Sequence, residues 1–285
     1  YDRLTAPVLR IGSNDPDALE AVASDPPPPF LEPWGVVVSN NEEVVVVDAS
    51  RALVHIESPP AISISRSVAL PSDKYDPIPI GVIFDTFGNI VITDQANNMV
   101  KVLLADGGCK GLGIEGSEPC QFRRPCGLAL ETRSEQDGGT WIWVVDQGNQ
   151  RVQAFTQPLW THRQSFTQFS EPCAIAVDHK SKRIIVTDTG ARLHILQRGN
   201  HDVKVTLTIK NYPNYDEDMP AATGIVIDEN GNAIIADTFQ NKLFVVRLTD
   251  GQIIAQIGNG TFKSPRGLFI SPSGRLFVTD HHRIQ

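Results

Sequence analysis

Short apolar runs alternate with polar turns along the whole chain, and the segment 223–246 shows this arrangement most clearly. An apolar run is followed by a turn at 229–232 and by a second run that ends in Asp237. A polar loop at 238–241 then leads into a third run at 242–246. The runs are rich in β-branched residues, and Asn-Gly between two apolar runs is a strong hairpin signal. The segment therefore predicts three antiparallel strands.

The same unit occurs six times along the chain, and in each copy the second run ends in an aspartate. These residues are Asp48, Asp94, Asp146, Asp188, Asp237 and Asp280. They are 46, 52, 42, 49 and 43 residues apart, a spacing typical of four-stranded propeller blades. The chain is therefore predicted to be an all-β protein with the fold of a six-bladed β-propeller.

A glycine precedes the aspartate at a fixed distance in most copies. It lies 13 residues before the aspartate in four of them, at Gly35, Gly81, Gly224 and Gly267. Ala174 takes this place in the fourth copy, and an insertion at 133–139 moves Gly127 to 19 residues before Asp146.

At these positions the chain resembles the NHL-repeat family. The repeat of that family opens with F-x-x-P-x-G and continues with a strand, a second strand that ends in Asp, the motif N-x-R/K and a third strand. Copies one, three and six match the opening in full, and copy four matches with alanine for glycine: Phe30-Pro33-Gly35, Phe122-Pro125-Gly127, Phe262-Pro265-Gly267 and Phe169-Pro172-Ala174. Copies two and five lack the phenylalanine, so reshaped opening loops are expected there. The resemblance covers almost the whole chain. NHL propellers form the C-terminal domain of TRIM-NHL ubiquitin ligases, where they recruit substrates or bind RNA, and they also occur in a peptide-amidating enzyme and in bacterial receptors.

The six blades are expected within a single domain, 1–285. Their approximate ranges are 33–70, 80–116, 126–168, 173–209, 223–258 and 266–285. The last copy has only three strands, and the segment 7–12 resembles the fourth strand of copy five. We expect this segment to supply the outer strand of the last blade, because such closure leaves no open seam in the ring. The start at Tyr1, without methionine, suggests a domain of a longer protein.

All six aspartates are expected at the edge of one face of the ring. In a propeller the loops from second to third strand and the connections between blades lie at the same end, which we call the upper face. A ring of carboxylates suggests a metal site, but an identical residue at the start of a polar loop in every repeat is what capping of loop N–H groups requires. We interpret the aspartates as structural caps and expect no metal and no cofactor.

The residue before each glycine is expected to line the mouth of the central channel. The six residues are Trp34, Ile80, Cys126, Cys173, Thr223 and Arg266. Cys126 and Cys173 occupy equivalent positions in adjacent blades, but two thiols without further ligands make a poor zinc site. Free cysteine usually behaves as a small hydrophobe, so a structural role is favoured for both.

The remaining cysteines, Cys109 and Cys120, leave open whether they are bonded to each other. Four cysteines are too few for a disulfide-built fold of this size. They favour reduced thiols and a cytoplasmic location.

Composition narrows the possible functions. The 285 residues carry a formal charge of −8, which disfavours nucleic-acid binding, and no apolar run reaches the ~18 residues of a membrane helix. No G-x-S-x-G or H-E-x-x-H motif occurs. The amidating relatives hold zinc through channel histidines, and none of the six channel positions is histidine. A catalytic role is therefore not expected, and a propeller lyase or hydrolase is only the third hypothesis.

The upper face is predicted to be the binding surface, because its loops carry Arg, Tyr and Trp, which anchor protein partners and stack on RNA bases. The predicted partner-binding residues are Trp34, Asn97, Asn98, Arg123, Arg124, Arg151, Tyr212, Tyr215, Lys242, Lys263 and Arg266. In RNA-binding NHL domains this face is strongly basic, whereas here acidic residues are interspersed. The resemblance thus implies a monomeric, non-catalytic propeller that binds the protein substrates of a TRIM-type ubiquitin ligase. Sequence-selective binding of single-stranded RNA is the alternative.

Overall fold

The computed structural model describes residues 11–12, 30–57, 64–133, 139–188, 192–198, 203–209, 222–258 and 260–285. Regular structure in these ranges consists of β-strands and two 3-10 turns, η2 (Ala49–Arg51) and η4 (Gln147–Asn149). Within them, no helix has the length and apolar character that a membrane crossing requires.

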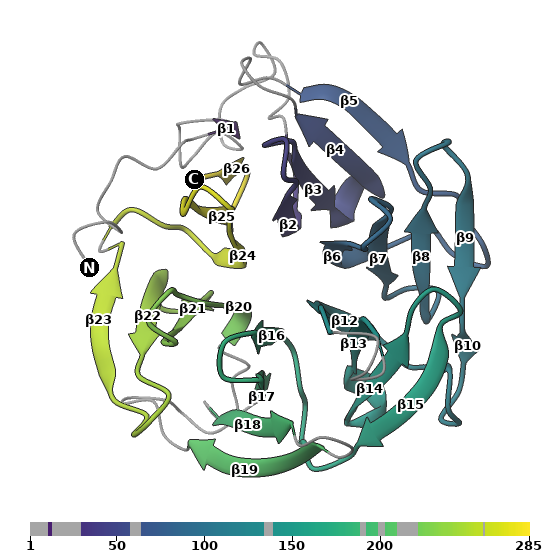
Figure 1. Ribbon diagram of the computed structural model, residues 1–285. Coiled ribbons are helices and arrows are strands. Elements are labelled where there is room, and N and C mark those ends of the chain that lie inside the picture. Colours follow the sequence, from purple (N-terminus) through teal and green to yellow (C-terminus); the bar gives the residue numbers. More distant parts are fainter. Residues whose placement is uncertain are drawn as a thin grey trace.

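Six four-stranded antiparallel sheets form a ring, and the first strand of each sheet lies innermost (Figure 1). Blades one and two are β2 (Pro33–Val38), β3 (Val44–Asp48), β4 (Leu53–Glu57) and β5 (Ile64–Ala69), then β6 (Pro79–Phe84), β7 (Ile90–Asp94), β8 (Met99–Leu103) and β9 (Cys109–Leu112). Blades three and four are β12 (Pro125–Glu131), β13 (Trp141–Asp146), β14 (Arg151–Thr156) and β15 (Thr161–Phe166), then β16 (Ile175–Asp178), β17 (Arg183–Asp188), β18 (Arg192–Arg198) and β19 (Val203–Ile209).

Blade five consists of β20 (Ala222–Ile227), β21 (Ala233–Asp237), β22 (Lys242–Val246) and β23 (Ile253–Ile257). Blade six consists of β24 (Pro265–Ile270), β25 (Leu276–Asp280), β26 (Arg283–Ile284) and β1 (Ile11–Gly12). A short parallel pair, β10 (Ile114–Glu115) with β11 (Gln121–Phe122), lies in the connection between blades two and three. The predicted six-bladed propeller is confirmed.

The ring is closed by the N-terminal strand, as the sequence predicts. β1 pairs antiparallel with β26, placing Ile11 opposite Ile284 and Gly12 opposite Arg283. The first part of the predicted closing segment, 7–10, lies outside the described residues. Because β1 comes from the other end of the chain, main-chain hydrogen bonds within blade six tie the N-terminal segment to the C-terminal strand and close the ring.

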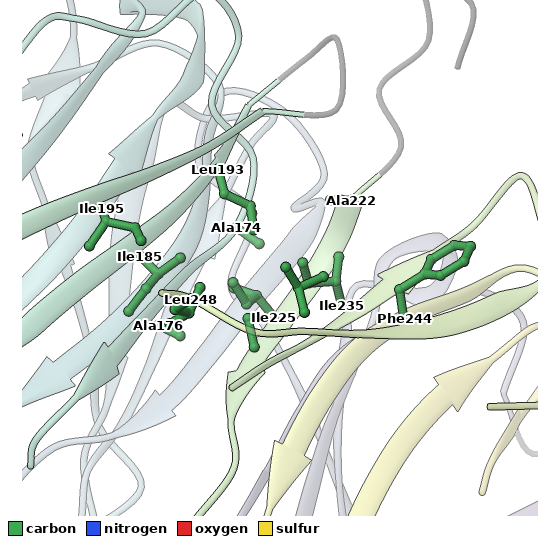
Figure 2. Close-up of a cluster of buried hydrophobic side chains, with 12 residues drawn as sticks. Ala174, Ala176, Ile185, Leu193, Ile195, Ala222, Ile225, Ile235, Phe244 and Leu248 are labelled. Carbon is green, nitrogen blue, oxygen red and sulfur yellow. The ribbon is translucent and has the colours of Figure 1, made fainter. Parts of the chain in front are cut away.

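The hydrophobic core is divided among the interfaces between neighbouring blades. Each of the six buried clusters draws its side chains from two adjacent sheets, and together they cover all six junctions of the ring. Figure 2 shows the junction of blades four and five, where Ala176, Ile185 and Ile195 meet Ile225, Ile235 and Phe244. Side chains from two facing sheets interdigitate here as in a β-sandwich, so neither blade buries its apolar face alone.

The phenylalanine that opens the repeat is part of these cores. Phe30, Phe122, Phe169 and Phe262 are all buried, each between two blades. Burial of this phenylalanine anchors the connection that follows it to the blades on both sides. Full burial of such a ring contributes on the order of 2–3 kcal/mol, which explains its recurrence.

The glycine of the repeat is required by a close approach between neighbouring blades. A Cβ on Gly224 would lie 1.9 Å from the carbonyl oxygen of Arg266, and one on Gly81 would lie 2.2 Å from that of Cys126. Real Cβ atoms do not come this near to a backbone oxygen, so the innermost strands pack closely only where the side chain is absent. Ala174 is accommodated between blades four and five, where its methyl joins the core.

The threonine before the aspartate links the innermost strands in blades two, four and six. Thr279 Oγ1 accepts a hydrogen bond from the Gly267 amide at 2.7 Å and donates one to the Trp34 carbonyl at 2.6 Å. Thr93 and Thr187 likewise accept a hydrogen bond from an amide of their own blade and donate one to a carbonyl of the next blade. These hydroxyls satisfy backbone groups that face the channel and would otherwise lack partners.

Blade two has the reshaped opening loop that its missing phenylalanine predicts. The buried Lys101 ammonium lies 3.0 Å from Asp94 and 2.9 Å from Asp73, and it also donates to the Pro71 carbonyl. Burial alone would lower the pKa of Lys101, but the two carboxylates outweigh it and raise the pKa above the usual value. An ion-pair cluster thus replaces the aromatic ring. The loop before blade five, 210–221, lies outside the described residues.

Candidate functional site

Five of the six repeat aspartates hold the connection that enters their own blade. Each accepts at least one backbone N–H from that connection, at 2.6–3.1 Å: Asp48 from Leu31 and Glu32, Asp94 from Ile78, Asp146 from Arg123, Asp188 from Ser170 and Glu171, and Asp280 from Lys263. Among the described residues, Asp237 accepts from Phe239 and Gln240 of its own loop, at 3.0 and 2.8 Å; the connection that enters its blade, 210–221, lies outside them. The carboxylates therefore fix the backbone of the upper face.

The third strand decides how well each aspartate is paired. Asp188 also accepts from His194 Nε2 at 3.0 Å, whereas the phenyl ring of Phe244 offers no hydrogen-bond donor in blade five. Burial would raise the pKa of Asp188, but the bonds from His194 and the two backbone amides lower it below the usual value. Burial dominates at Asp237 and raises its pKa. The described contacts thus favour the charged form of Asp188, whereas at Asp237 burial outweighs the hydrogen bonds from its own loop.

Arg123 and Arg124 are exposed, and their backbones are held from both sides. The Arg123 amide donates to Asp146 at 2.7 Å, and the Arg124 amide donates to Asn98 Oδ1 at 2.8 Å. Arg124 and Asn98 both have left-handed backbones, with φ of 49° and 54°. Because such backbones are uncommon outside glycine, these hydrogen bonds specify the loop.

The connection entering blade six has the same frame. The Lys263 amide donates to Asp280 at 2.7 Å, and the Ser264 amide donates to Asn241 Oδ1 at 2.6 Å. Blades three and six lie on opposite sides of the ring (Figure 1). Exposed cations at Arg123, Arg124 and Lys263 are therefore held on both sides of the channel mouth.

Trp34 and Arg266 form a cluster at the junction of blades six and one. The Arg266 guanidinium lies 4.3 Å from the centre of the Trp34 ring and 2.9 Å from the Glu32 carboxylate. Trp34 Nε1 donates to the same Glu32 oxygen at 3.3 Å, and Ser50 donates to the other oxygen at 2.7 Å. Burial would raise the pKa of Glu32, but Ser50 and Arg266 outweigh it and lower the pKa. Much of the charge of Arg266 is compensated here.

The channel is narrow at its upper end and wide below. A cavity of about 80 Å³ is lined by five of the six predicted channel residues, Trp34, Ile80, Cys126, Cys173 and Thr223. Arg266 is not in its lining, since its side chain lies over Trp34. Toward the opposite face the innermost strands enclose a cavity of about 690 Å³.

Several predicted partner-binding residues have their polar groups occupied by the fold. Arg151 is buried and donates to Asp146 and to the carbonyls of Ser117, Glu118 and Gln121. The buried Asn97 bonds to Asp94 and to the backbone of Tyr75, and Asn98 holds Arg124. Lys242 is half-buried at the start of β22, and Tyr212 and Tyr215 lie outside the described residues. This placement favours a structural role for Arg151, Asn97 and Asn98.

The sequence interpretation missed exposed apolar residues of the upper face, and three of them lie in its loops. Tyr75 and Ile78 lie in the connection into blade two and are 52% and 42% exposed, and Phe239, in the loop after Asp237, is 48% exposed. The available signal was an apolar residue inside an otherwise polar loop. Together with the clamped cations, they give this face both charged and apolar contact groups.

The chain is similar to the E3 ubiquitin-protein ligase TRIM32 of Homo sapiens and of Mus musculus. It is 20% identical to both, over 280 residues in the human protein and 281 in the mouse protein. Each match covers 88% of this chain and 40% of the relative, so the chain spans less than half the length of these proteins. No protein-family model matches the sequence. With the six-bladed fold, the similarity confirms the resemblance to the NHL-repeat propellers of TRIM proteins.

Solved propeller enzymes share the fold. A catalytically inactive virginiamycin B lyase from Staphylococcus aureus, crystallised with quinupristin, superposes with a TM-score of 0.65 at 15% identity, over 95% of this chain and 82% of the lyase. A gluconolactonase from Xanthomonas campestris superposes with a TM-score of 0.67 at 14% identity, over 90% of this chain and 85% of the enzyme. At such identities the likeness shows the architecture and assigns no reaction.

Proposed function

We propose that this propeller is a non-catalytic recognition module that binds a protein partner across its upper face. The observation that carries the proposal is the clamping of Arg123 and Arg124, whose side chains are exposed while their amides are fixed by Asp146 and Asn98. A loop already held in one conformation loses little entropy when it binds, so its side chains convert contacts into affinity efficiently.

The chemistry of the upper face favours a protein over a nucleic acid. Tyr75, Ile78 and Phe239 provide the apolar contact area of a protein interface. The formal charge of −8 and the compensation of Arg266 by Glu32 leave few cations for phosphates. An acidic segment of a partner that also presents apolar side chains fits this combination.

The similarity to TRIM32 supports a finer proposal. The propeller selects the substrates of a ubiquitin-protein ligase, as a single monomeric domain over 1–285, and the four free cysteines favour a cytoplasmic location. The aspartates then act as structural caps, and recognition rests on Trp34, Arg123, Arg124, Lys263 and Arg266.

Charge reversal on the upper face tests the proposal. The variant Arg123→Glu, Arg124→Glu, Lys263→Glu changes only exposed side chains and keeps the amides that bond to the fold. A matched control reverses three exposed cations away from this face: Lys110 on the outer strand, with Lys182 and Arg275 in the turns of the opposite face. Both variants change the formal charge from −8 to −14, so any difference between them reflects position (−8 − 6 = −14).

Partners captured from an extract with the wild type are compared with and without nuclease treatment, and their affinities are then measured with both variants. We expect nuclease-resistant protein partners, a loss of at least about tenfold in affinity for the upper-face variant and less than about twofold for the control. Tight, salt-sensitive and sequence-selective binding of a single-stranded RNA pool by the wild type would support the RNA alternative instead. Equal losses for the two variants would refute the upper face as the binding surface.

A further inference from the structure

The structure brings Cys126 and Cys173 together at the upper end of the channel. Cys126 is the second residue of β12, Cys173 stands two residues before β16, and both line the same cavity. The Cys126 thiol lies 3.0 Å from the carbonyl oxygen of Cys173 and interacts with the Cys173 side chain. The backbones also touch, because a Cβ on Gly127 would lie 2.7 Å from that carbonyl oxygen.

Both backbones are held in place by other parts of the two blades. The Cys126 carbonyl accepts a hydrogen bond from Thr93 Oγ1 at 2.7 Å, and the Cys173 amide donates to the Thr187 carbonyl at 3.0 Å. The close approach of the two residues is therefore built into the fold, and their side chains already interact. Preorganisation of this kind favours reaction between the two side chains over reaction with external groups.

The two thiols differ in acidity. The hydrogen bond from Cys126 lowers the pKa of Cys173, and Arg124 acts in the same direction while Glu171 opposes it. Burial, followed by the interaction with Cys173, raises the pKa of Cys126 well above its usual value. Cys173 is thus the sulfur that ionises first, and Cys126 keeps its proton. Since the thiolate is the nucleophile, Cys173 is the reactive member of the pair.

The cavity sets which reagents reach the sulfurs. Its volume of about 80 Å³ has room for molecules of the size of water or hydrogen peroxide. Cys126 is buried and Cys173 is half-buried, whereas Cys120 is exposed and Cys109 is half-buried at the rim of blade two. Large reagents therefore reach Cys120 first, and small oxidants also reach the channel pair.

We propose that Cys126 and Cys173 form a dithiol that hydrogen peroxide converts into a disulfide between blades three and four. The Cys173 thiolate attacks one peroxide oxygen, so that an S–O bond forms, the O–O bond breaks and hydroxide leaves as water after protonation. The Cys126 sulfur, losing its proton, then attacks the sulfenic sulfur of Cys173, forming the S–S bond and releasing the second water. In total two thiols lose two electrons and two protons, and one peroxide is reduced to two waters.

The disulfide would join the innermost strands of two neighbouring blades across 47 residues of chain. It would reduce the freedom of the unfolded chain and restrict opening of the ring at this junction. The disulfide would also lie beneath the upper face proposed for partner binding. Oxidation would therefore make the base of that surface more rigid without covering the surface itself.

The four cysteines lie on separate tryptic peptides, which makes the linkage directly measurable; the two from the channel span 124–133 and 164–180. A Cys109→Ser, Cys120→Ser protein keeps only the channel pair. After treatment with hydrogen peroxide we expect it to lose both titratable thiols, to give a linked peptide of 124–133 with 164–180, and to melt on the order of 5 °C higher until dithiothreitol is added.

Two further variants in that background test the order of the steps. With Cys126→Ser, Cys173 should form a sulfenic acid that dimedone traps, whereas with Cys173→Ser the remaining Cys126 should stay largely unmodified. Circular dichroism before oxidation verifies that each variant is folded. The proposal is overturned if folded protein retains both channel thiols while Cys120 of the wild type is consumed, or if only intermolecular disulfides form.

Discussion

The contrast between Asp188 and Asp237 gives the sharpest test of how the upper face is held together. Both are buried and occupy the same position in the repeat, so a change of each to asparagine alters the same chemical group in equivalent surroundings. The substitution keeps the shape of the side chain but leaves one oxygen instead of two as acceptor and removes the charge.

At Asp188 both oxygens are in use. Ser170 and His194 donate to one oxygen, at 2.9 and 3.0 Å, and Glu171 donates to the other at 2.6 Å. In Asp188→Asn the new NH₂ group must face at least one of these donors, so a buried charge-assisted hydrogen bond is lost. Such a loss costs roughly 1.5–3 kcal/mol.

At Asp237 a single oxygen accepts both backbone amides of its loop, from Phe239 and Gln240. In Asp237→Asn the amide oxygen takes over both bonds, and the Gln240 side chain can rotate to accept from the new NH₂ group. The pKa of Asp237 is raised by burial, so removal of its charge also relieves an electrostatic cost. We expect a change of no more than about 1 kcal/mol in the free energy of unfolding.

Urea unfolding of both variants and the wild type at pH 7 measures the difference. With a slope of about 3 kcal/mol/M for a chain of this length, a difference of about 2 kcal/mol separates the two midpoints by roughly 0.7 M. Equal slopes would show that the denatured states are alike. If Asp237→Asn were as destabilising as Asp188→Asn, the pairing of each aspartate by its third strand would not determine its contribution.

Three further predictions concern the fold. Gly224→Ala should destabilise the protein by at least about 3 kcal/mol or prevent folding, because its methyl would overlap the carbonyl of Arg266. In the same urea assay the control Gly88→Ala should cost only about 1 kcal/mol, because its methyl meets no neighbouring atom and only the left-handed backbone is strained. Lys101→Met should cost about 3–5 kcal/mol, because it leaves the buried Asp94 carboxylate without its cation; a cost below 1 kcal/mol would contradict the ion-pair account. Burial and neighbouring cations lower the pKa of His281 to about 4. Between pH 6.5 and 4 the unfolded chain therefore binds a proton that the folded chain does not, so the unfolding midpoint should decrease as the pH is lowered through this window. His281→Gln should flatten that dependence, and an unchanged profile would refute the assignment.

The fold was predictable because its information is local and repeated. A hairpin signal, an aspartate and a glycine recur at nearly constant spacing, and six repetitions leave little choice of architecture. Closure by β1 was predictable for the same reason, since the last copy lacks a fourth strand and the N-terminal segment resembles one. The reshaped loop of blade two followed from a missing phenylalanine, although the sequence did not indicate that Lys101 would fill the gap.

The roles of individual polar residues were decided by the tertiary structure. Arg123, in the connection that enters blade three, and Arg151, at the start of β14, are the same residue type, yet Arg123 is exposed and Arg151 is buried with four acceptors. Cys126 and Cys173 occupy matching positions in their repeats, but their contact depends on how closely two blades approach. Spacing along the chain determines which face a residue lies on, whereas its partners come from connections and neighbouring blades that only the folded ring brings beside it. Their identity is set by the register of the strands and by the packing of each blade against its connection and its neighbour.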